Sequence, residues 1–93
     1  MTRKYTMSES TEFFDEQTLL EMVDNQLIDG NPLQVKATLM RLVMKGTPRE
    51  EALQYIACAL GAELMAMEAE QGPFNLERYA QFLDSLPEMP WAE

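Results

Sequence analysis

The sequence contains no histidine and a single cysteine, Cys58. Without histidine, the commonest general base and the commonest metal ligand are both missing, so serine-type hydrolysis and imidazole metal sites are not expected. A single cysteine excludes an intrachain disulfide, and we therefore expect a cytoplasmic protein. Cys58 lies between Ala57 and Ala59 in the most apolar stretch of the chain. We expect it to be a small core side chain and not a nucleophile.

Basic residues are also few. Lysine and arginine together number 7, against 16 aspartates and glutamates, which gives a net charge of −9. Nucleic acids and anionic membranes are bound by clustered basic side chains, so neither is an expected partner. No stretch approaches the about 18 uncharged apolar residues that a membrane-spanning helix needs. The glycines are all separate, so the chain has no glycine-rich loop that could bind phosphate.

The 93 residues, 46% of them hydrophobic, suffice for one domain with one modest core. We expect a flexible polar segment over residues 1–10 and a single helical domain over 11–86. A non-helical tail should follow over 87–93, because Pro87 and Pro90 interrupt any helix there. Met7 is a second candidate for the translation start.

Four stretches have the apolar spacing of helices, at about 16–28, 32–45, 48–70 and 76–85. Gly30 and Gly46 stand where helices commonly end in a left-handed residue, and Gly72 with Pro73 closes the third helix. The expected N-caps are Asn31, Thr47 (in a capping box with Glu50) and Asn75, with Phe74 packing against Tyr79.

The third helix is apolar around most of its girth, so the other helices should pack around it. Between Ala52 and Met67 the only strongly polar residues are Gln54 and Glu63, which are expected to face solvent, or else a small polar pocket. The short connections favour antiparallel neighbours. The sequence therefore predicts an all-α fold: a compact four-helix domain, an irregular or orthogonal bundle, with a central apolar third helix.

The first two helices show which side chains should be buried. In the first, the expected core residues are Leu19, Leu20, Met22, Val23, Leu27 and Ile28. In the second, they are Leu33, Val35, Leu39, Met40, Leu42 and Val43, with Lys36, Arg41 and Lys45 forming a basic outer face.

A domain of this size cannot cover so apolar a third helix completely. Met40, Met44, Leu64 and Met67 are therefore predicted to form a residual patch that contacts a protein partner, and a symmetric homodimer is one expectation. Met89 and Trp91 in the tail either dock on the domain itself or contact a partner. The leading interpretation is a non-enzymatic protein-interaction domain, without catalytic residues, cofactor or metal.

Two alternatives remain open, because carboxylates cluster near the first helix. A solvated acidic face explains them most simply. A carboxylate-dependent metal-binding or hydrolytic site would use Asp15, Glu16, Asp24 and Glu50. An acidic mimic of nucleic acid would instead occupy a basic protein.

Several short sequence patterns follow one another between Val23 and Pro87. They are Val-Asp-Asn-Gln-Leu, Gly-Asn-Pro and Thr-Leu-x-Arg-Leu within 23–42, Gly-x-x-Arg-x-Glu-Ala-Leu over 46–53, Pro-Phe-x-x-Glu-Arg-Tyr over 73–79, and Leu83 followed by Leu86-Pro87. Over about two-thirds of its length, the chain thus resembles a bacterial family of small all-helical proteins catalogued as a domain of unknown function. The resemblance implies an all-helical fold and no activity. Members often carry histidine pairs where this chain has Glu16, Leu20, Glu50 and Gln54, so metal binding by such pairs does not carry over.

Overall fold

The computed structural model describes residues 15–89, and within that range it contains four helices and no strand. They are α2 (Glu16–Asp29), α3 (Leu33–Met44), α4 (Arg49–Glu70) and α5 (Leu76–Ser85). The predicted all-α four-helix fold is therefore confirmed. The predicted flexible segment 1–10, the first four residues of the predicted domain and the end of the predicted tail lie outside the described range.

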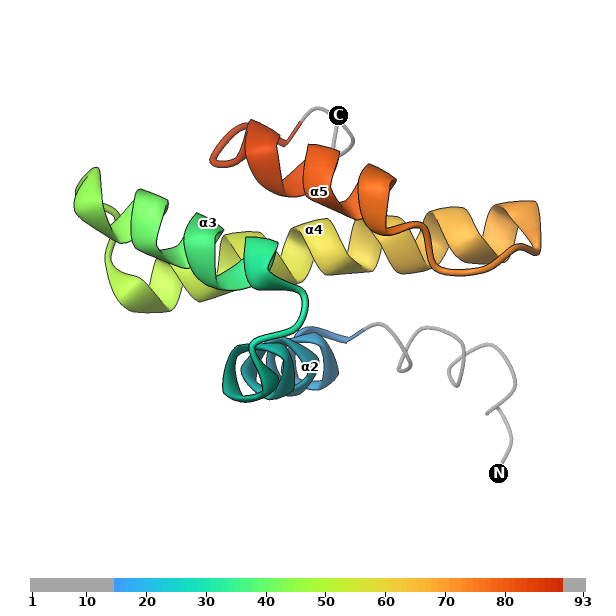
Figure 1. Ribbon diagram of the computed structural model, residues 1–93, viewed down its shortest axis with the longest axis horizontal. Helices are drawn as coiled ribbons and strands as arrows, with labels where there is room; N and C mark the ends of the chain where they lie inside the picture. Colours follow the sequence, from blue (N-terminus) through green and yellow to red (C-terminus); the bar gives the residue numbers. More distant parts are fainter. Residues whose placement is uncertain (1–14, 90–93) are drawn as a thin grey trace, which may run out of the picture.

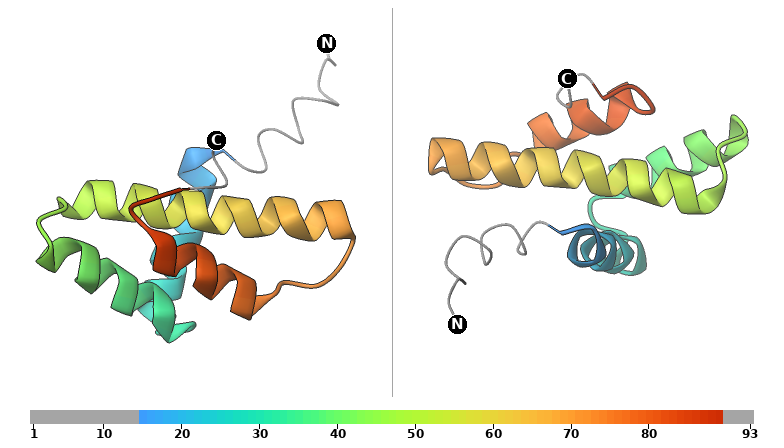
Figure 2. Two further views of the ribbon diagram at one scale, coloured as in Figure 1. Left: turned by 90° about the horizontal axis from the view of Figure 1, so that it is seen from above. Right: turned by 180° about the vertical axis from the view of Figure 1, so that it is seen from behind.

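α4 is the central element, as predicted, because each of the other three helices packs against it. α3 lies along the N-terminal half of α4 and α5 along the middle of α4, both antiparallel to it (Figure 1). α2 crosses α4 transversely on the side away from α5 (Figure 2), so the orthogonal form of the predicted bundle is the correct one. Gly61 lies at this crossing: a Cβ built there would be 3.2 Å from Cδ1 of Leu19. The absent side chain lets the two helices approach.

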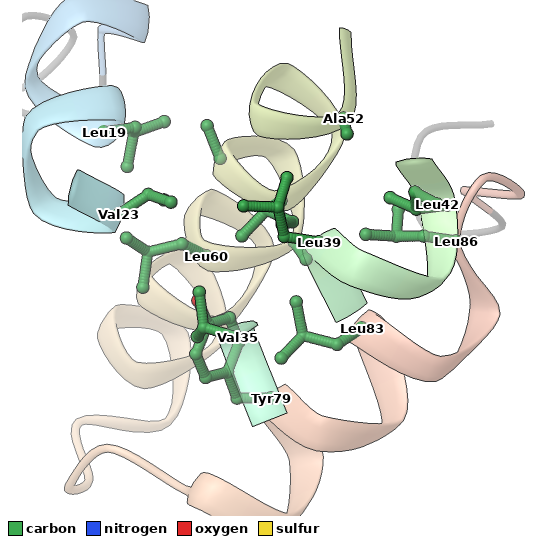
Figure 3. Packing of buried hydrophobic residues seen from close by; sticks show 13 residues of the cluster. Leu19, Val23, Val35, Leu39, Leu42, Ala52, Leu60, Tyr79, Leu83 and Leu86 are labelled. Atoms are coloured by element: carbon green, nitrogen blue, oxygen red, sulfur yellow. The ribbon is translucent and has the colours of Figure 1, made fainter. Parts of the chain in front are cut away.

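Apolar side chains from all four helices meet in one core around α4 (Figure 3). The buried apolar residues are Leu19, Val23, Val35, Leu39, Leu42, Ala52, Ile56, Ala57, Ala59, Leu60, Tyr79, Leu83 and Leu86. Four of the core residues predicted for α2 and α3 are exposed instead, namely Ile28, Leu33, Met40 and Val43. Each lies on a side of its helix that no other described helix covers.

The helix ends follow the predicted glycines. Gly30 and Gly46 have φ values of 69° and 104°, in the left-handed region. After α3, the Gly46 N–H donates to the carbonyl of Val43 and the Thr47 N–H donates to that of Leu42. This is a Schellman motif, which satisfies carbonyls that the helix leaves free. α4 ends one residue earlier than the expected glycine, because Gln71 takes the left-handed conformation, with φ 54°.

The start of α5 is as predicted. Asn75 accepts a hydrogen bond from the Arg78 N–H, and the Phe74 ring meets the Tyr79 ring edge-on with centroids 5.4 Å apart. The cap and the hydrophobic contact together fix the angle at which the chain enters the helix. α2 has a cap of the same kind, since Asp15 accepts the Thr18 N–H at 2.8 Å. That backbone hydrogen bond lowers the pKa of Asp15.

The predicted N-caps of α3 and α4 are wrong. The cap residues are Pro32 and Pro48, with extended ψ values of 151° and 145°, and neither helix has a side-chain cap hydrogen bond. Asn31 and Thr47 therefore lie one residue outside the cap, and the capping box with Glu50 does not form. The proline ring fixes φ at a value that suits both the N-cap and the first helical position. The ψ angle of the proline therefore decides which of the two positions it occupies.

Candidate functional site

α3 has two apolar faces on opposite sides of the helix. One packs into the core through Val35, Leu39 and Leu42. On the other side, four apolar residues recur at spacings of four, three and four. At about 100° per residue, this second set is centred opposite the buried one. We call it, together with the neighbouring valine, the outer face of α3, and all its members are exposed: Leu33, Ala37, Met40, Val43 and Met44.

The C-terminal end of the outer face borders an apolar groove of about 310 Å³. The groove lies between α3 and the first residue of α4, and Arg49 is the only charged residue in its lining. The large side chains at its edge are far from covered, since Met40 is 52% and Met44 81% exposed. An elongated apolar side chain of another molecule would find its contacts here.

Basic residues gather around the same face. From Gly30 to Arg49 the sequence has no aspartate or glutamate, although the chain as a whole carries a net charge of −9. Between residues 15 and 89, the only basic side chain outside this stretch is Arg78, which pairs with Glu63 and Glu70. The vicinity of α3 is therefore positive on an otherwise acidic domain.

One of these basic residues is used by the fold itself. The guanidinium of Arg41 donates to the carbonyls of Leu83 and Leu86, both at 2.9 Å, and so caps the C-terminal end of α5. Of the three basic residues predicted to face solvent on this helix, Arg41 therefore does not do so. Lys36 and Lys45 are exposed, as is Arg49 at the groove, and none of these three forms an ion pair within residues 15–89.

The predicted partner-binding residues do not form one patch. Met40 and Met44 lie on the outer face of α3. Leu64 and Met67 are half-buried and lie more than about 20 Å further along α4, judged from the helical rise after Arg49. Met89 is half-buried and packs against the core. Trp91 lies beyond the last described residue.

A second opening lies between α2 and α4. This α2–α4 pocket has a volume of about 550 Å³ and is lined by Glu16, Leu19, Glu51, Gln54, Tyr55, Ala57, Cys58 and Met89. Gln54 is exposed, as predicted. Of the four positions at which the resembled family often has histidine, Glu16 and Gln54 meet here, whereas Leu20 and Glu50 do not line the pocket.

The predicted core position of Cys58 is wrong, because its side chain is exposed beside the crossing of α2. A transverse helix covers only a short length of α4 and leaves this flank open. Partial burial and the negative charge of Glu16 both raise the pKa of the Cys58 thiol. A raised pKa lowers the fraction of thiolate, so the exposed thiol is not activated as a nucleophile.

The carboxylates of the metal alternative are also separated. Glu16 lines the α2–α4 pocket together with Glu51, while Glu50 lies outside it. Asp24 is two turns further along α2, about 12 Å from Glu16 by the helical rise. Across residues 15–89, no three cysteine, aspartate or glutamate side chains are grouped so that they could hold a metal ion.

Of the two expectations for Glu63, exposure to solvent is wrong, because its side chain is fully buried. Its carboxylate accepts hydrogen bonds from Nε and Nη2 of Arg78 at 2.6 and 3.0 Å and from the Asn75 N–H at 2.7 Å. Burial raises the pKa of Glu63, but the hydrogen bonds and the charge of Arg78 outweigh it and lower the pKa overall. The same pairing raises the pKa of Arg78. In the sequence, the signal for this buried pair is a carboxylate within the apolar stretch from Ala52 to Met67.

Comparison of the chain with protein-family models, with curated proteins and with solved structures gave no match in any of the three. Over residues 15–89, no helix is both long and apolar enough to cross a membrane.

Proposed function

We propose that this chain is a non-enzymatic, cytoplasmic protein-interaction domain and that its partner docks on the outer face of α3. The observation that carries the proposal is a continuous apolar stripe on the side of α3 opposite its core face. Apolar side chains scattered singly over a surface need no explanation, but a contiguous stripe bordered by charge is typical of a protein contact. The exposed methionines suit such a contact, because their side chains adapt to different shapes.

The α2–α4 pocket supports catalysis less well. The pKa of its Cys58 thiol is raised by partial burial and by the negative charge of Glu16, which lowers the fraction of reactive thiolate. General acid–base chemistry needs a group poised to exchange a proton, and the pocket lining includes no histidine. The arrangement favours binding over chemistry.

A second copy of the chain is the other occupant to consider. In a symmetric dimer through the outer face of α3, the basic groups around one copy of this face would lie near those around the other copy. Lys36, Lys45 and Arg49 would then repel the basic groups of the second chain, whereas a partner of opposite charge avoids that cost. Light scattering after gel filtration measures the outcome directly: the monomer has a mass of 10.7 kDa, and a dimer has twice that mass.

The proposal is tested by photo-crosslinking in cells that express the protein. A photoreactive amino acid replaces Met40 on the outer face or, as a matched control, Met65, a 61% exposed methionine on α4. We expect a discrete protein adduct from position 40 and none from position 65. The absence of an adduct at position 40, or the same adducts from both positions, would contradict the proposal.

A further inference from the structure

We propose that the segment docking on the outer face of α3 is an acidic amphipathic helix of the partner protein. This inference rests on the proposed function and adds the chemical class of the partner. It follows from the spacing of the apolar residues on α3 and from the position of the basic residues around them.

The spacing fits a helix. Leu33, Ala37, Met40 and Met44 recur four, three and four residues apart, as the contact positions of a coiled-coil seam do. The seam is about 16 Å long, which corresponds to three turns of a partner helix. Such a helix would place its own apolar side chains between these four, with the groove beside Met44 receiving one more.

The charges fit an acidic partner. Taken around the helix axis at about 100° per residue, Lys36 and Lys45 fall on opposite sides of the seam. Arg49 borders it at the groove. Since none of the three is paired within residues 15–89, each can meet an aspartate or glutamate beside the apolar positions of the partner helix. Flanking pairs of this kind select the partner and its register.

A narrow helix fits better than an anionic membrane. Glu50 and Glu51 are exposed directly after Arg49, and the domain as a whole is acidic. A flat anionic surface would meet these carboxylates together with the basic residues. A helix about 10 Å across contacts only the stripe between Lys36 and Lys45 and avoids most of that repulsion.

The test uses three fluorescein-labelled peptides of 15 residues, titrated with the full chain and followed by fluorescence anisotropy. The first carries leucines at seam positions flanked by glutamates. The second keeps the leucines and has lysines in place of the glutamates. The third keeps the glutamates and has serines in place of the leucines. We expect the first to bind at least about tenfold more tightly than either of the others, and to weaken as salt is raised.

Variants of the chain locate the binding. Lys36→Glu combined with Arg49→Glu should reverse the preference between the glutamate and lysine peptides, and Met40→Ser combined with Met44→Ser should abolish binding. Met65→Ser is the matched control and should leave the affinity unchanged. All of these side chains are exposed, and circular dichroism verifies that each variant is folded.

Four results would overturn the inference. They are equal or tighter binding of the lysine peptide, an unchanged preference in the charge-reversed variant, tighter binding to phosphatidylcholine–phosphatidylserine vesicles than to the glutamate peptide, and a crosslink from position 40 into the chain itself or a second copy. If position 40 still crosslinks to another protein in cells while the glutamate peptide fails, the proposed function stands and the acidic-helix inference falls. If both fail, both are wrong.

Discussion

The α4–α5 junction and the surroundings of the outer face of α3 differ in how their charged side chains are paired. At the junction, the buried Glu63 carboxylate receives hydrogen bonds from the Arg78 guanidinium and the Asn75 N–H. On α3, Lys36 and Lys45 have no carboxylate partner within residues 15–89. Carboxylates are not scarce, since the chain has 16 of them against 7 basic side chains. The lack of carboxylate partners for Lys36 and Lys45 within residues 15–89 is therefore not due to a shortage of carboxylates in the chain.

The comparison separates two roles of polar groups. A buried ion pair that lost one partner would leave a charge out of water, so the junction is tied to folding. Exposed basic groups keep their hydration, contribute little to folding and stay available for binding. We therefore expect substitutions at the junction to change the free energy of unfolding, and substitutions on the outer face of α3 to change binding alone.

Among the charged residues, the largest effect on stability is expected for Glu63→Ala. The substitution removes the buried carboxylate, leaves the Asn75 N–H without its acceptor and opens a cavity. Because the Arg78 side chain is 20% exposed and can turn to water, the cost should lie near the lower end for a broken buried pair, about 3 kcal/mol. Urea unfolding measures it. Glu68→Ala, at an exposed position of the same helix, should change stability by less than about 0.5 kcal/mol. Equal effects of the two would mean that the junction is not closed in solution.

The pH dependence of stability sharpens the same point. The folded state lowers the pKa of Glu63 from its ordinary value of 4.5. A carboxylate with a lowered folded-state pKa stabilises the fold fully above its unfolded pKa, and this contribution is lost as the pH falls through the folded-state pKa. The stability advantage of the wild type over Glu63→Gln should therefore narrow as the pH falls below about 4.5. Parallel urea titrations between pH 7 and pH 3 test this, and an advantage that grew on acidification would contradict it.

A smaller change in stability should distinguish Arg41 from Lys36. Arg41→Met removes two hydrogen bonds to the carbonyls of Leu83 and Leu86 and should cost about 2 kcal/mol in unfolding free energy. Lys36→Met, five residues earlier on the same helix, changes an exposed side chain and should stay within about 0.5 kcal/mol. Thermal melts of the two variants compare them. Similar losses would show that Lys36 also has a structural partner.

Much of the fold could be predicted from local signals. Gly30, Gly46 and Asn75 stand at helix boundaries because their backbone or side-chain chemistry acts within one turn. The predicted N-caps Asn31 and Thr47 were wrong for a local reason too. The proline that follows each of them has the same φ whether it is the N-cap or the first residue of the helix, so the sequence does not distinguish the two. Local chemistry thus located the ends of the helices to within a residue or two.

The candidate site was harder to predict, because α3 is apolar on two sides. Leu39 and Met40 are neighbours of similar hydrophobicity, and periodicity alone does not say which of them is buried. The placement of α2, α4 and α5 decides it, which is information about the whole fold. The ion pair between Glu63 and Arg78 could not be predicted for the same reason. Its two residues are 15 positions apart and meet only when α5 folds back on α4.

The smallest effect on stability, and the one that bears most directly on the outer face of α3, is expected for Met40→Ser combined with Met44→Ser. Both side chains are more than half exposed, so their loss should change the free energy of unfolding by less than about 0.5 kcal/mol. The adjacent Leu39 is 9% exposed, and Leu39→Ala should cost about 2–4 kcal/mol, because it leaves a cavity in the core. Urea unfolding of the two variants compares the opposite faces of one helix. If the double methionine variant lost as much stability as Leu39→Ala, the outer face would be packed against part of the chain itself, and it would not be free to bind a partner.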